Sequence, residues 1–239
     1  MKAVILAGGI GTRMRPLTYI VPKAMLPIGG KPLLEHMVQY LKEYDITDVI
    51  VCVAYLKTRI MDYFKHGESL GVKIRYAESE TPLGTAGQLN TAKKFVSERF
   101  VAMNGDIVTS LNLRSLIEFH KKRRAVGTIA LKRFDISVPY GYVEIGEDSN
   151  ILKFEEKPKF SFLANAGIYV FEPKIFQYIP EGKTVSLEKE TFPLLLGKGG
   201  KLNGYYEDAY WADVGTVTDF ERVDKELLSK SDTENQEAR

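Results

Sequence analysis

The hydrophobic positions of this chain alternate between continuous apolar runs and helix-like segments through the first 125 residues. Apolar runs typical of buried strands occupy residues 3–7, 49–53 and 100–103. Helix-like segments lie between and after them, at residues 32–44, 57–64, 86–95 and 113–124. Strands that are apolar on both faces and alternate with helices predict a parallel sheet covered by helices on both sides.

The pattern changes after residue 125, where strand signals crowd together. They fall at residues 127–133, 142–145, 151–155 and 164–171, and only short helical segments at 173–178 and 187–196 interrupt them. No linker rich in Pro, Gly or Ser separates the two halves, so we expect them to share one sheet. The prediction is an α/β fold in one domain, residues 1–228: three layers, with a mixed, mainly parallel sheet flanked by helices.

The end of the chain carries one more helix signal. Thr216 and Asp219 have the spacing of a helix cap, which predicts a last helix over about residues 217–228. The remaining residues, 229–239, are polar, and we expect a frayed tail there.

Composition and charge exclude several classes of protein. Of 239 residues, 44% are hydrophobic, enough for a substantial core, and 33 basic residues nearly balance 31 acidic ones. This balance argues against binding to nucleic acid or to an anionic membrane surface. No apolar run approaches the roughly 20 residues of a membrane span. The single cysteine, Cys52, lies in an apolar run and cannot form an internal disulfide, so we expect a reducing, cytoplasmic location.

The loop after the first strand, GGIGTRMRPLT, combines glycines with Arg13 and Arg15. Loops at this place lie at the carboxyl edge of a parallel sheet, where ligands bind. Glycines let the backbone approach a ligand, and arginines suit phosphate oxygens, so the loop resembles a phosphate cradle. It is neither a P-loop, since the Lys-Ser/Thr ending is absent, nor a dinucleotide fingerprint, since Met14 stands at the third glycine position. A plain strand-to-helix turn is the alternative.

Isolated charged residues stand at the ends of other apolar runs. Lys23 lies between two prolines, Asp106 follows FVAMNG, and Asp213 lies in YWADVGT. Two carboxylates from separate strand ends that face phosphates suit Mg²⁺. The alternatives are a turn at Asp106 and a turn or helix cap at Asp213. The three histidines show no metal or triad spacing, and no serine lies in a nucleophile elbow.

Nine motifs occur in the order seen in sugar-1-phosphate nucleotidyltransferases, over about residues 1–225: GGIGTRMRPLT, PKAMLPI, PLGTAG, NGD, YGYV, EEKP, NAGIYVF, SLEKETFP and WADVGT. The chain therefore resembles this family of nucleotide-sugar biosynthesis. The resemblance implies a Rossmann-like nucleotidyltransferase fold. It also implies transfer of a nucleotidyl group from a nucleoside triphosphate to a sugar 1-phosphate, with release of pyrophosphate and no covalent intermediate.

The resemblance also implies roles for residues of the first half, about 1–125, which would bind the nucleotide. Arg13 would hold the departing pyrophosphate, and Lys23 the α-phosphate or the sugar phosphate. Asp106 and Asp213 would bind Mg²⁺. The acidic residue expected before PLGTAG is displaced, which leaves Glu78 and Glu80 as candidates for a base contact. The other nucleotide-binding residues would be Leu6, Ala7, Gly8, Gly9, Gly11, Thr12 and Gly84.

The second half, about residues 126–228, would bind the sugar phosphate. By the same resemblance, Lys157 is the anchor of the sugar phosphate and a catalytic residue with Arg13 and Lys23. Gly141, Glu156 and Asn165 form the sugar-binding set, with Ala166 as a further candidate.

Three functions stay open. PLGTAG, SLEKETFP and W-x-D-x-G resemble mannose-1-phosphate guanylyltransferases most closely, which implies GTP and mannose 1-phosphate as substrates. PKAMLPI also resembles enzymes that use UTP or dTTP with glucose 1-phosphate. Some members of the family are non-catalytic regulatory subunits that bind nucleotide sugars, but the presence of Arg13, Lys23, Asp106, Lys157 and Asp213 favours catalysis. Association of the chain with copies of itself stays open as well.

Overall fold

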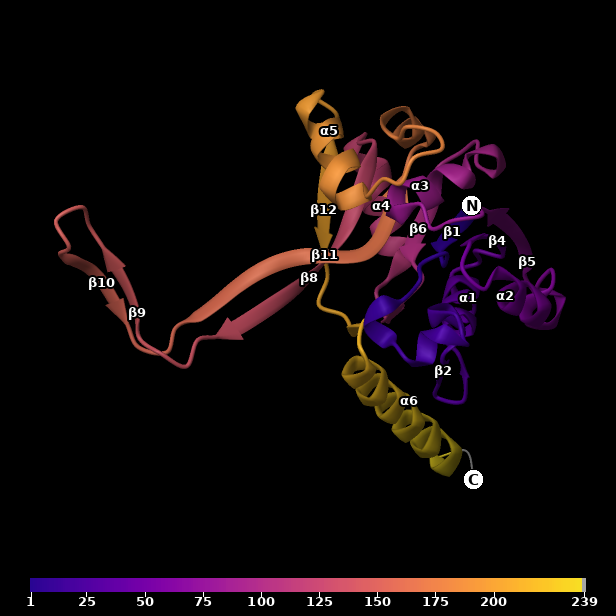
Figure 1. Ribbon diagram of the computed structural model, residues 1–239, viewed down its shortest axis with the longest axis horizontal. Helices are drawn as coiled ribbons and strands as arrows, with labels where there is room; N and C mark the ends of the chain where they lie inside the picture. Colours follow the sequence, from indigo (N-terminus) through magenta and orange to yellow (C-terminus); the bar gives the residue numbers. More distant parts are fainter. Residues whose placement is uncertain (238–239) are drawn as a thin grey trace.

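The computed structural model describes residues 1–237, with side chains through residue 229, and its centre is a seven-stranded mixed sheet (Figure 1). The strand order is β12-β8-β11-β6-β1-β4-β5. β5, β4, β1 and β6 run parallel, β11 is antiparallel to both of its neighbours, and β12 is parallel to β8. Strands from both halves of the chain therefore share one mainly parallel sheet, as the sequence predicts. The strands are β1 (Lys2–Leu6), β4 (Asp48–Val53), β5 (Lys73–Glu78), β6 (Phe100–Asn104), β8 (Gly127–Ser137), β11 (Lys159–Phe171) and β12 (Leu202–Tyr206).

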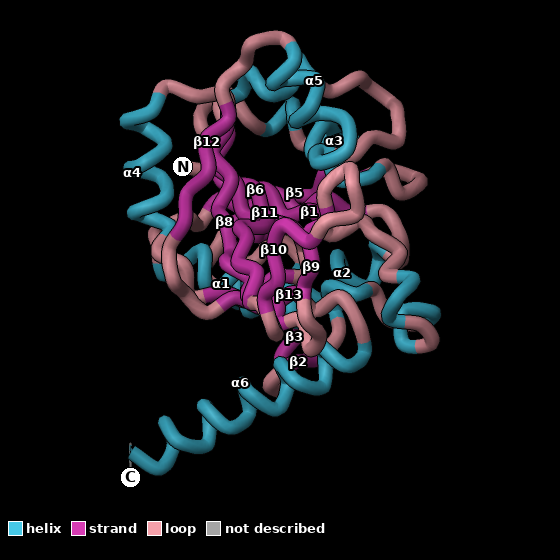
Figure 2. The backbone as a smooth tube through the Cα atoms, turned by 90° about the vertical axis from the view of Figure 1, so that its left-hand side faces the viewer, coloured by secondary structure: helices cyan, strands magenta, loops and turns pink. Residues whose placement is uncertain are grey.

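Helices cover both faces of this sheet, which gives three layers. α1 (Leu33–Glu43), α2 (Lys57–Phe64) and α4 (Leu113–Arg123) pack on the face that carries Ile5 and Val51. α3 (Gly84–Thr91) and α5 (Phe192–Gly197) pack on the opposite face, which carries Val4 and Ile50. Figure 2 shows α3 and α5 above the sheet and α1 and α2 below it. Each large apolar side chain buried in these layers contributes about 1.5–3 kcal/mol, which explains why the strands are apolar on both faces.

Smaller elements complete the structure and shape the loops at the carboxyl edge of the sheet. β7 (Ile107–Thr109) pairs with β13 (Trp211–Asp213), β2 (Pro27–Ile28) with β3 (Lys31–Pro32), and β9 (Tyr142–Ile145) with β10 (Ile151–Glu155), all antiparallel. A π-helical turn, Leu187–Thr191, leads into α5. Six 3₁₀ turns lie at Thr12–Met14, Leu17–Tyr19, Lys23–Met25, Glu68–Leu70, Lys93–Phe95 and Pro173–Tyr178.

An arm projects from this body (Figure 1). We define the arm as residues 133–163: the outer parts of β8 and β11, which pair out to Ser137 and Lys159, followed by the β9–β10 hairpin at the far end. The strands expected at residues 127–133 and 164–171 are therefore the inner parts of longer strands. Period and composition alone cannot show where a strand leaves the sheet.

Three further expectations about elements need correction. β5 and β12 were not predicted, because β5 is only partly buried and β12 contains Asn203 and Gly204, which weaken a strand signal. The helix expected at residues 86–95 is α3 followed by a 3₁₀ turn. The last helix, α6, spans Val217–Glu237 and so includes most of the expected tail.

The start of α6 is capped as expected, since Asp219 N donates to Thr216 Oγ1 over 3.2 Å. The helix continues past residue 228 because no Gly or Pro interrupts the chain between Thr216 and Glu237. The last two residues of the expected tail, 238 and 239, lie outside the described residues. Within residues 1–237, none of the helices has both the length and the hydropathy to cross a lipid bilayer.

Gly84 at the start of α3 gives a test of this packing. Its φ is +70°, and a Cβ there would lie 2.5 Å from the backbone oxygen of Val185. Gly182 has a similar φ, +67°, but open space around it. Gly182→Ala should cost about 1–2 kcal/mol for the left-handed conformation alone. Gly84→Ala should cost about 3 kcal/mol or more, because overpacking adds about 1–3 kcal/mol. Urea unfolding of both variants measures the difference, and equal losses would show that Val185 yields freely.

Candidate active site

The glycine-rich loop leaves β1 at the carboxyl edge of the sheet and is fixed at both ends. Gly8 N donates to the buried Gln88 Oε1 on α3 over 2.7 Å. Gly11, in the left-handed conformation with φ +68°, accepts from Thr18 Oγ1 at its carbonyl oxygen over 2.8 Å. Between these points Gly9 is exposed, and a Cβ there would contact nothing within 4 Å. The loop therefore presents bare backbone to the space beside it.

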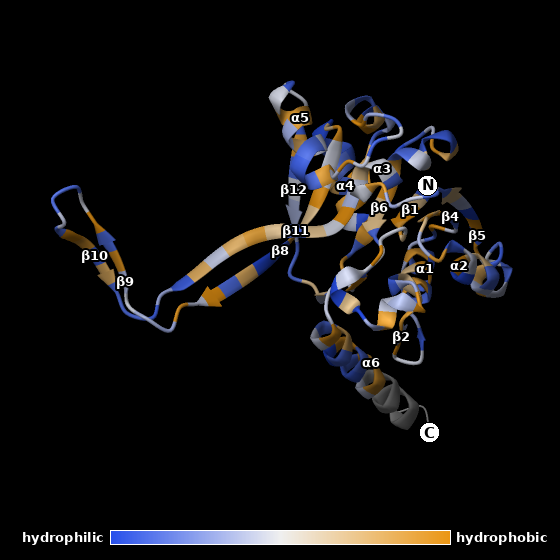
Figure 3. Ribbon diagram, viewed as in Figure 1, coloured by the Kyte–Doolittle hydropathy of each residue, from blue (hydrophilic) through white to orange (hydrophobic). Residues whose placement is uncertain are grey.

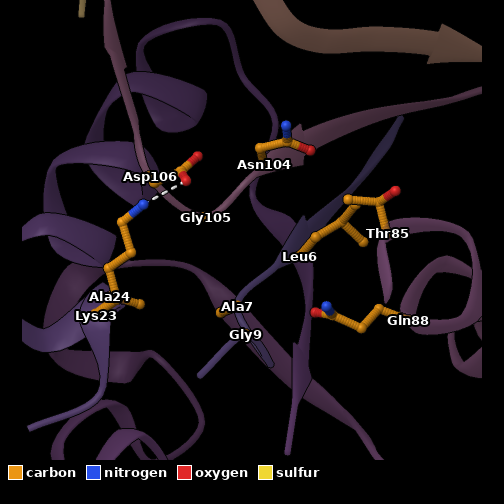
Figure 4. A pocket seen from close by; sticks show the side chains of 10 residues that line it. All are labelled: Leu6, Ala7, Gly9, Lys23, Ala24, Thr85, Gln88, Asn104, Gly105 and Asp106. Atoms are coloured by element: carbon orange, nitrogen blue, oxygen red, sulfur yellow. Dashed lines mark hydrogen bonds and ion pairs between the residues drawn. The ribbon is translucent and has the colours of Figure 1, made fainter. Parts of the chain in front are cut away.

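An open cavity of about 160 Å³ lies at the ends of β1 and β6 (Figure 4). Gly105 N donates to Leu6 O over 3.0 Å, and a Cβ on Gly105 would lie 2.6 Å from that oxygen. Only glycine allows the two strand ends to come this close. The cavity is lined by Leu6, Ala7, Gly9, Lys23, Ala24, Thr85, Gln88, Asn104, Gly105 and Asp106.

Three charged groups meet at one side of this cavity. Lys23 Nζ donates to Asp106 Oδ2 over 2.6 Å and lies 3.9 Å from Asp213 Oδ1. The pairing of β7 with β13 brings the two carboxylates together, and Val214 N donates to Asp106 O over 2.9 Å. These residues come from three distant parts of the chain, so tertiary structure assembles the cluster.

The surroundings of Asp213 disfavour the ionised form of its carboxyl group. Burial, and then the negative charge of Asp106, raise the pKa of Asp213, while Lys23 and Arg13 oppose that rise. Its Oδ1 atom is buried and has no hydrogen-bond partner among the described residues. A buried carboxylate oxygen without a donor favours a cation beside it.

Arg13 approaches the same carboxylate from the glycine-rich loop. A Cβ on Gly215 would lie 2.9 Å from Asp213 Oδ2 and 3.2 Å from Arg13 Nη2. The guanidinium and the carboxylate therefore flank Gly215, and Thr12 lies exposed in the same 3₁₀ turn as Arg13. The structure thus brings together Arg13, Lys23, Asp106 and Asp213, four residues that the sequence predicts for one site.

A second polar network lies along the other side of the cavity. Glu188 Oε2 accepts from Thr85 Oγ1 over 2.8 Å and from Ser186 Oγ over 2.7 Å. Tyr169 OH donates to Glu188 Oε1 over 3.2 Å and accepts from Asn165 Nδ2 over 2.8 Å. This chain of hydrogen bonds connects Asn165, one of the predicted sugar-binding residues, to the cavity wall at Thr85.

Several cavity residues were not identified individually from the sequence. Thr85, Gln88 and Asn104 line the cavity, and Glu188 supports it from behind. The motifs PLGTAG and SLEKETFP contain or adjoin three of them, but the pattern alone does not show which polar side chain turns inward.

Other predicted site residues lie away from the cavity. Glu78 is the last residue of β5, two strands from β1, and Glu80 follows shortly after; both pair with Lys57 Nζ, at 3.2 and 2.9 Å. Gly84 packs against Val185 rather than against open space. Ala166 is buried next to Asn165, and its carbonyl accepts from Trp211 Nε1 over 2.7 Å.

Three residues of the predicted sugar-phosphate set lie in the arm. Gly141 and Glu156 come together where the ribbon meets the distal hairpin, since a Cβ on Gly141 would lie 3.1 Å from Glu156 Oε2. Lys157 occupies the same bend, with φ +49°. The predicted site residues of one chain therefore lie in two separate places: some around the cavity, and Gly141, Glu156 and Lys157 in the arm.

The raised pKa of Asp213 predicts a stability effect. A carboxyl group whose pKa rises on folding stabilises the folded state while it is protonated, and this contribution is lost as the pH rises through its folded pKa. Asp213→Asn should therefore raise the thermal midpoint at about pH 7.5 in EDTA, and the gain should shrink toward the ordinary aspartate pKa of 3.8. Calorimetry against pH measures this. The exposed Asp208→Asn is the control, and a lower midpoint for Asp213→Asn would show that attraction to Lys23 and Arg13 prevails.

Comparison with known proteins finds relatives whose names describe one kind of enzyme. It is 39% identical over 232 residues to a mannose-1-phosphate guanylyltransferase of Mycobacterium tuberculosis, covering 95% of this chain and 65% of that protein. It is 34% identical over 248 residues to a UTP–glucose-1-phosphate uridylyltransferase of Synechocystis, covering 96% of this chain and 64% of that protein. The chain thus spans less than two thirds of the length of these curated relatives.

A solved structure is also similar to this fold. The crystal structure of HddC from Yersinia pseudotuberculosis complexed with GMP-PN matches with a TM-score of 0.75 and 27% identity, over 95% of this chain and 99% of that one. The model of the nucleotidyl transferase family matches residues 2–230. Together with the glycine-rich loop and the charged cavity, these matches show that the chain belongs to the nucleotidyl transferase family.

Proposed function

We propose that this chain transfers a nucleotidyl group from a nucleoside triphosphate to a hexose 1-phosphate, giving a nucleotide sugar and pyrophosphate. The observation that carries the proposal is the convergence of the glycine-rich loop, Arg13, Lys23, Asp106 and Asp213 on one cavity at the carboxyl edge of the sheet. Membership of the nucleotidyl transferase family supports it.

The chemistry requires charge neutralisation more than proton transfer. A phosphate oxygen of the sugar phosphate attacks the α-phosphorus, and the bond from that phosphorus to the bridging oxygen of pyrophosphate breaks. The attacking oxygen is already ionised, so no general base is needed, which agrees with the lack of a histidine or serine among the cavity residues. Lys23 and Arg13 would offset the repulsion between the two anionic reactants and stabilise the charge on the leaving group. Lys157 would anchor the sugar phosphate.

Magnesium is part of this proposal. Asp106 and Asp213 would hold the ion, and the buried Oδ1 of Asp213, which receives no hydrogen bond from the described residues, suits a cation. Mg²⁺ commonly binds through one or two carboxylates and substrate phosphates, so two aspartates suffice. Among the described residues no group of three or more His, Cys, Asp or Glu side chains forms a cage for a metal. When bound, the ion would neutralise phosphate charge beside Lys23.

Our preferred substrates are GTP and mannose 1-phosphate. The similarity to a mannose-1-phosphate guanylyltransferase and to a structure complexed with GMP-PN supports this choice. The similarity to a UTP–glucose-1-phosphate uridylyltransferase favours the alternative, a glucose-1-phosphate uridylyl- or thymidylyltransferase. A non-catalytic nucleotide-sugar-binding subunit is less well supported, because Arg13, Lys23, Asp106 and Asp213 are all present and close together. We further propose a cytoplasmic location, on the basis of the single, buried Cys52.

A matrix of substrates tests these alternatives. Pyrophosphate release is measured with five nucleoside triphosphates, each paired with mannose, glucose and other sugar 1-phosphates, in the presence of Mg²⁺. We expect the highest kcat/KM with GTP and mannose 1-phosphate. The highest value with UTP or dTTP and glucose 1-phosphate would establish the alternative enzyme. Binding of nucleotide sugars without any pyrophosphate release would instead indicate the regulatory subunit.

Substitution of Arg13 tests whether the glycine-rich loop binds phosphate or is a plain turn. Arg13→Ala should lower kcat/KM by the equivalent of about 2–4 kcal/mol, the cost of removing one electrostatic stabiliser in a closed site. Arg13→Lys keeps the charge but loses the two-pronged hydrogen bonding, so nucleotide affinity should survive better than turnover. Arg114→Ala, an exposed arginine on α4, is the control. Turnover of Arg13→Ala equal to that of the control would reject the cradle.

A further inference from the structure

The outer ribbon of the arm has one apolar face and one polar face. Phe134 pairs with Phe162 and Ile136 with Phe160, and the rings of Phe134 and Phe162 stack at 5.8 Å. The residues between them are mostly polar and point to the opposite side, where Asp135 pairs with Ser161. On the apolar face the side chains remain 37–52% exposed. A strand pair that contacts water on both sides gains nothing from large apolar side chains along one face, so this face indicates a missing contact.

The distal hairpin repeats this pattern. Val143 pairs with Phe154 and Ile145 with Ile151, and these four side chains are 41–65% exposed. The adjoining positions, Glu144 and Lys153, pair with each other on the other face. Figure 3 shows hydrophobic positions running out along β11 and into β9 and β10, away from the body.

The exposed apolar surface is large enough for a stable protein interface. Eight half-exposed side chains of this size present roughly 700–800 Å² per chain, given about 150–250 Å² for an aromatic side chain. A typical monomer exposes no apolar patch above about 300–600 Å². If two arms were covered together, the buried area would be about 1,500 Å², which is the standard size of a specific interface.

The arm also carries residues that the cavity lacks. Gly141, Glu156 and Lys157 lie beyond the last ribbon pair, Ser137 with Lys159. Five residue steps separate that pair from Lys132 and Ala164 at the root, which corresponds to about 17 Å. Asn165 remains at the root, tied to the cavity wall through Tyr169 and Glu188. The arm therefore holds Gly141, Glu156 and Lys157 away from the cavity of its own chain (Figure 1).

The direction of the arm is set by the central sheet. β8 pairs with β12 at residues 127–131 and with β11 out to Ser137, and its own strand contains no bulge. The irregularity lies in β11 only, between Asn165 and Tyr169, where Gly167 has φ +70°. From Asn165 with Leu131 out to Lys159 with Ser137 the two strands pair without interruption, and this stretch leads away from the cavity of its own chain (Figure 1). The arm is therefore accessible to a second copy of the chain.

The apolar face of the arm is turned toward the side of the cavity. Phe134, at the root, contacts Trp211 edge-on at 5.9 Å between ring centroids, and Trp211 lies two residues before Asp213. A partner that packs on the apolar face of the arm therefore lies on the same side of the molecule as the charged cluster of Lys23, Asp106 and Asp213.

From these observations we propose that two copies of the chain exchange arms, so that each arm packs on the other copy and brings Gly141, Glu156 and Lys157 to that copy's cavity. The pairing is symmetric, since the same surfaces are used by both copies, and it closes as a dimer. The role of the arm residues in catalysis rests on the proposed function, whereas the exchange itself does not.

Complementation between inactive variants tests the exchange. One chain carries Glu156→Ala and Lys157→Ala in the arm, and the other carries Arg13→Ala and Asp106→Asn at the cavity. The two are co-expressed with different affinity tags, and mixed dimers are purified through both tags. Arm exchange gives one intact site per mixed dimer and hence about half of wild-type turnover. An inactive mixed dimer would overturn the proposal.

A matched pair reverses the outcome. Here one chain carries all four substitutions and its partner is wild type. With exchanged arms, each site receives either a defective arm or a defective cavity, and the mixed dimer should be inactive. If each arm served its own chain, the wild-type half would keep about half of the activity, and the proposal would fail.

The oligomeric state separates failure of the exchange from failure of the proposed function. Sedimentation equilibrium should give a dimer for the wild type and a monomer for the Ile145→Asp/Phe154→Asp double variant. Glu144→Lys, on the polar face of the same hairpin, should remain dimeric. Circular dichroism should show a folded chain for all three, because these side chains lie outside the core, although loss of the dimer should lower the thermal midpoint of the double variant. A wild-type monomer, or a dimer unaffected by the double variant, would overturn the exchange even if the chain is active. A dimer that the double variant dissociates would support it even if no substrate pair reacts.

Discussion

The close approach of two carboxylates, Asp106 and Asp213, is the constraint on which the cavity depends. The β7–β13 pairing fixes their backbones, so the charges cannot move apart. Lys23 lies against one and near the other, and Arg13 reaches Asp213 past Gly215. Each cation is thus held by the anions it neutralises. The same cations would neutralise phosphate groups in the proposed reaction, and a phosphate that enters would compete with the carboxylates for them.

Close backbone approach is the second condition for the site. Gly105 lets the end of β6 lie against Leu6, and Gly8 reaches Gln88 on α3. These contacts join the two central strands to the helical layer above them and leave Gly9 open. The energetic cost of a sparsely packed loop and a buried carboxylate is offset by the core on both faces of the sheet, where most strand residues are fully buried.

The body and the arm divide the predicted functional residues between them. The body is held by two apolar clusters, one on each face of the sheet, and it carries most of the residues predicted to bind the nucleotide. The arm is a two-stranded continuation of β8 and β11, and such a ribbon is marginally stable by itself in water. Its apolar face is unfavourable for a single chain because it stays in contact with water. The same face is the surface through which a second chain could complete the site.

The sequence by itself determined the layered α/β architecture, because strands buried on both faces must be apolar throughout, and the segment from Ala3 to Leu6 shows this directly. It also predicted that Arg13 belongs to a site, from the charge of the glycine-rich loop, and that Lys23, Asp106 and Asp213 do, because each stands at the end of an apolar run where a packing role is hard to argue. Only the tertiary structure decided how these residues meet: the β7–β13 pairing is too short to leave a sequence pattern. Likewise, only the structure shows that Phe134, Ile136, Phe160 and Phe162 lie on one face of a β8–β11 ribbon that continues beyond the expected strands. Local pattern carries no information about which surface, or which copy of the chain, covers that face, because burial depends on contacts between segments far apart.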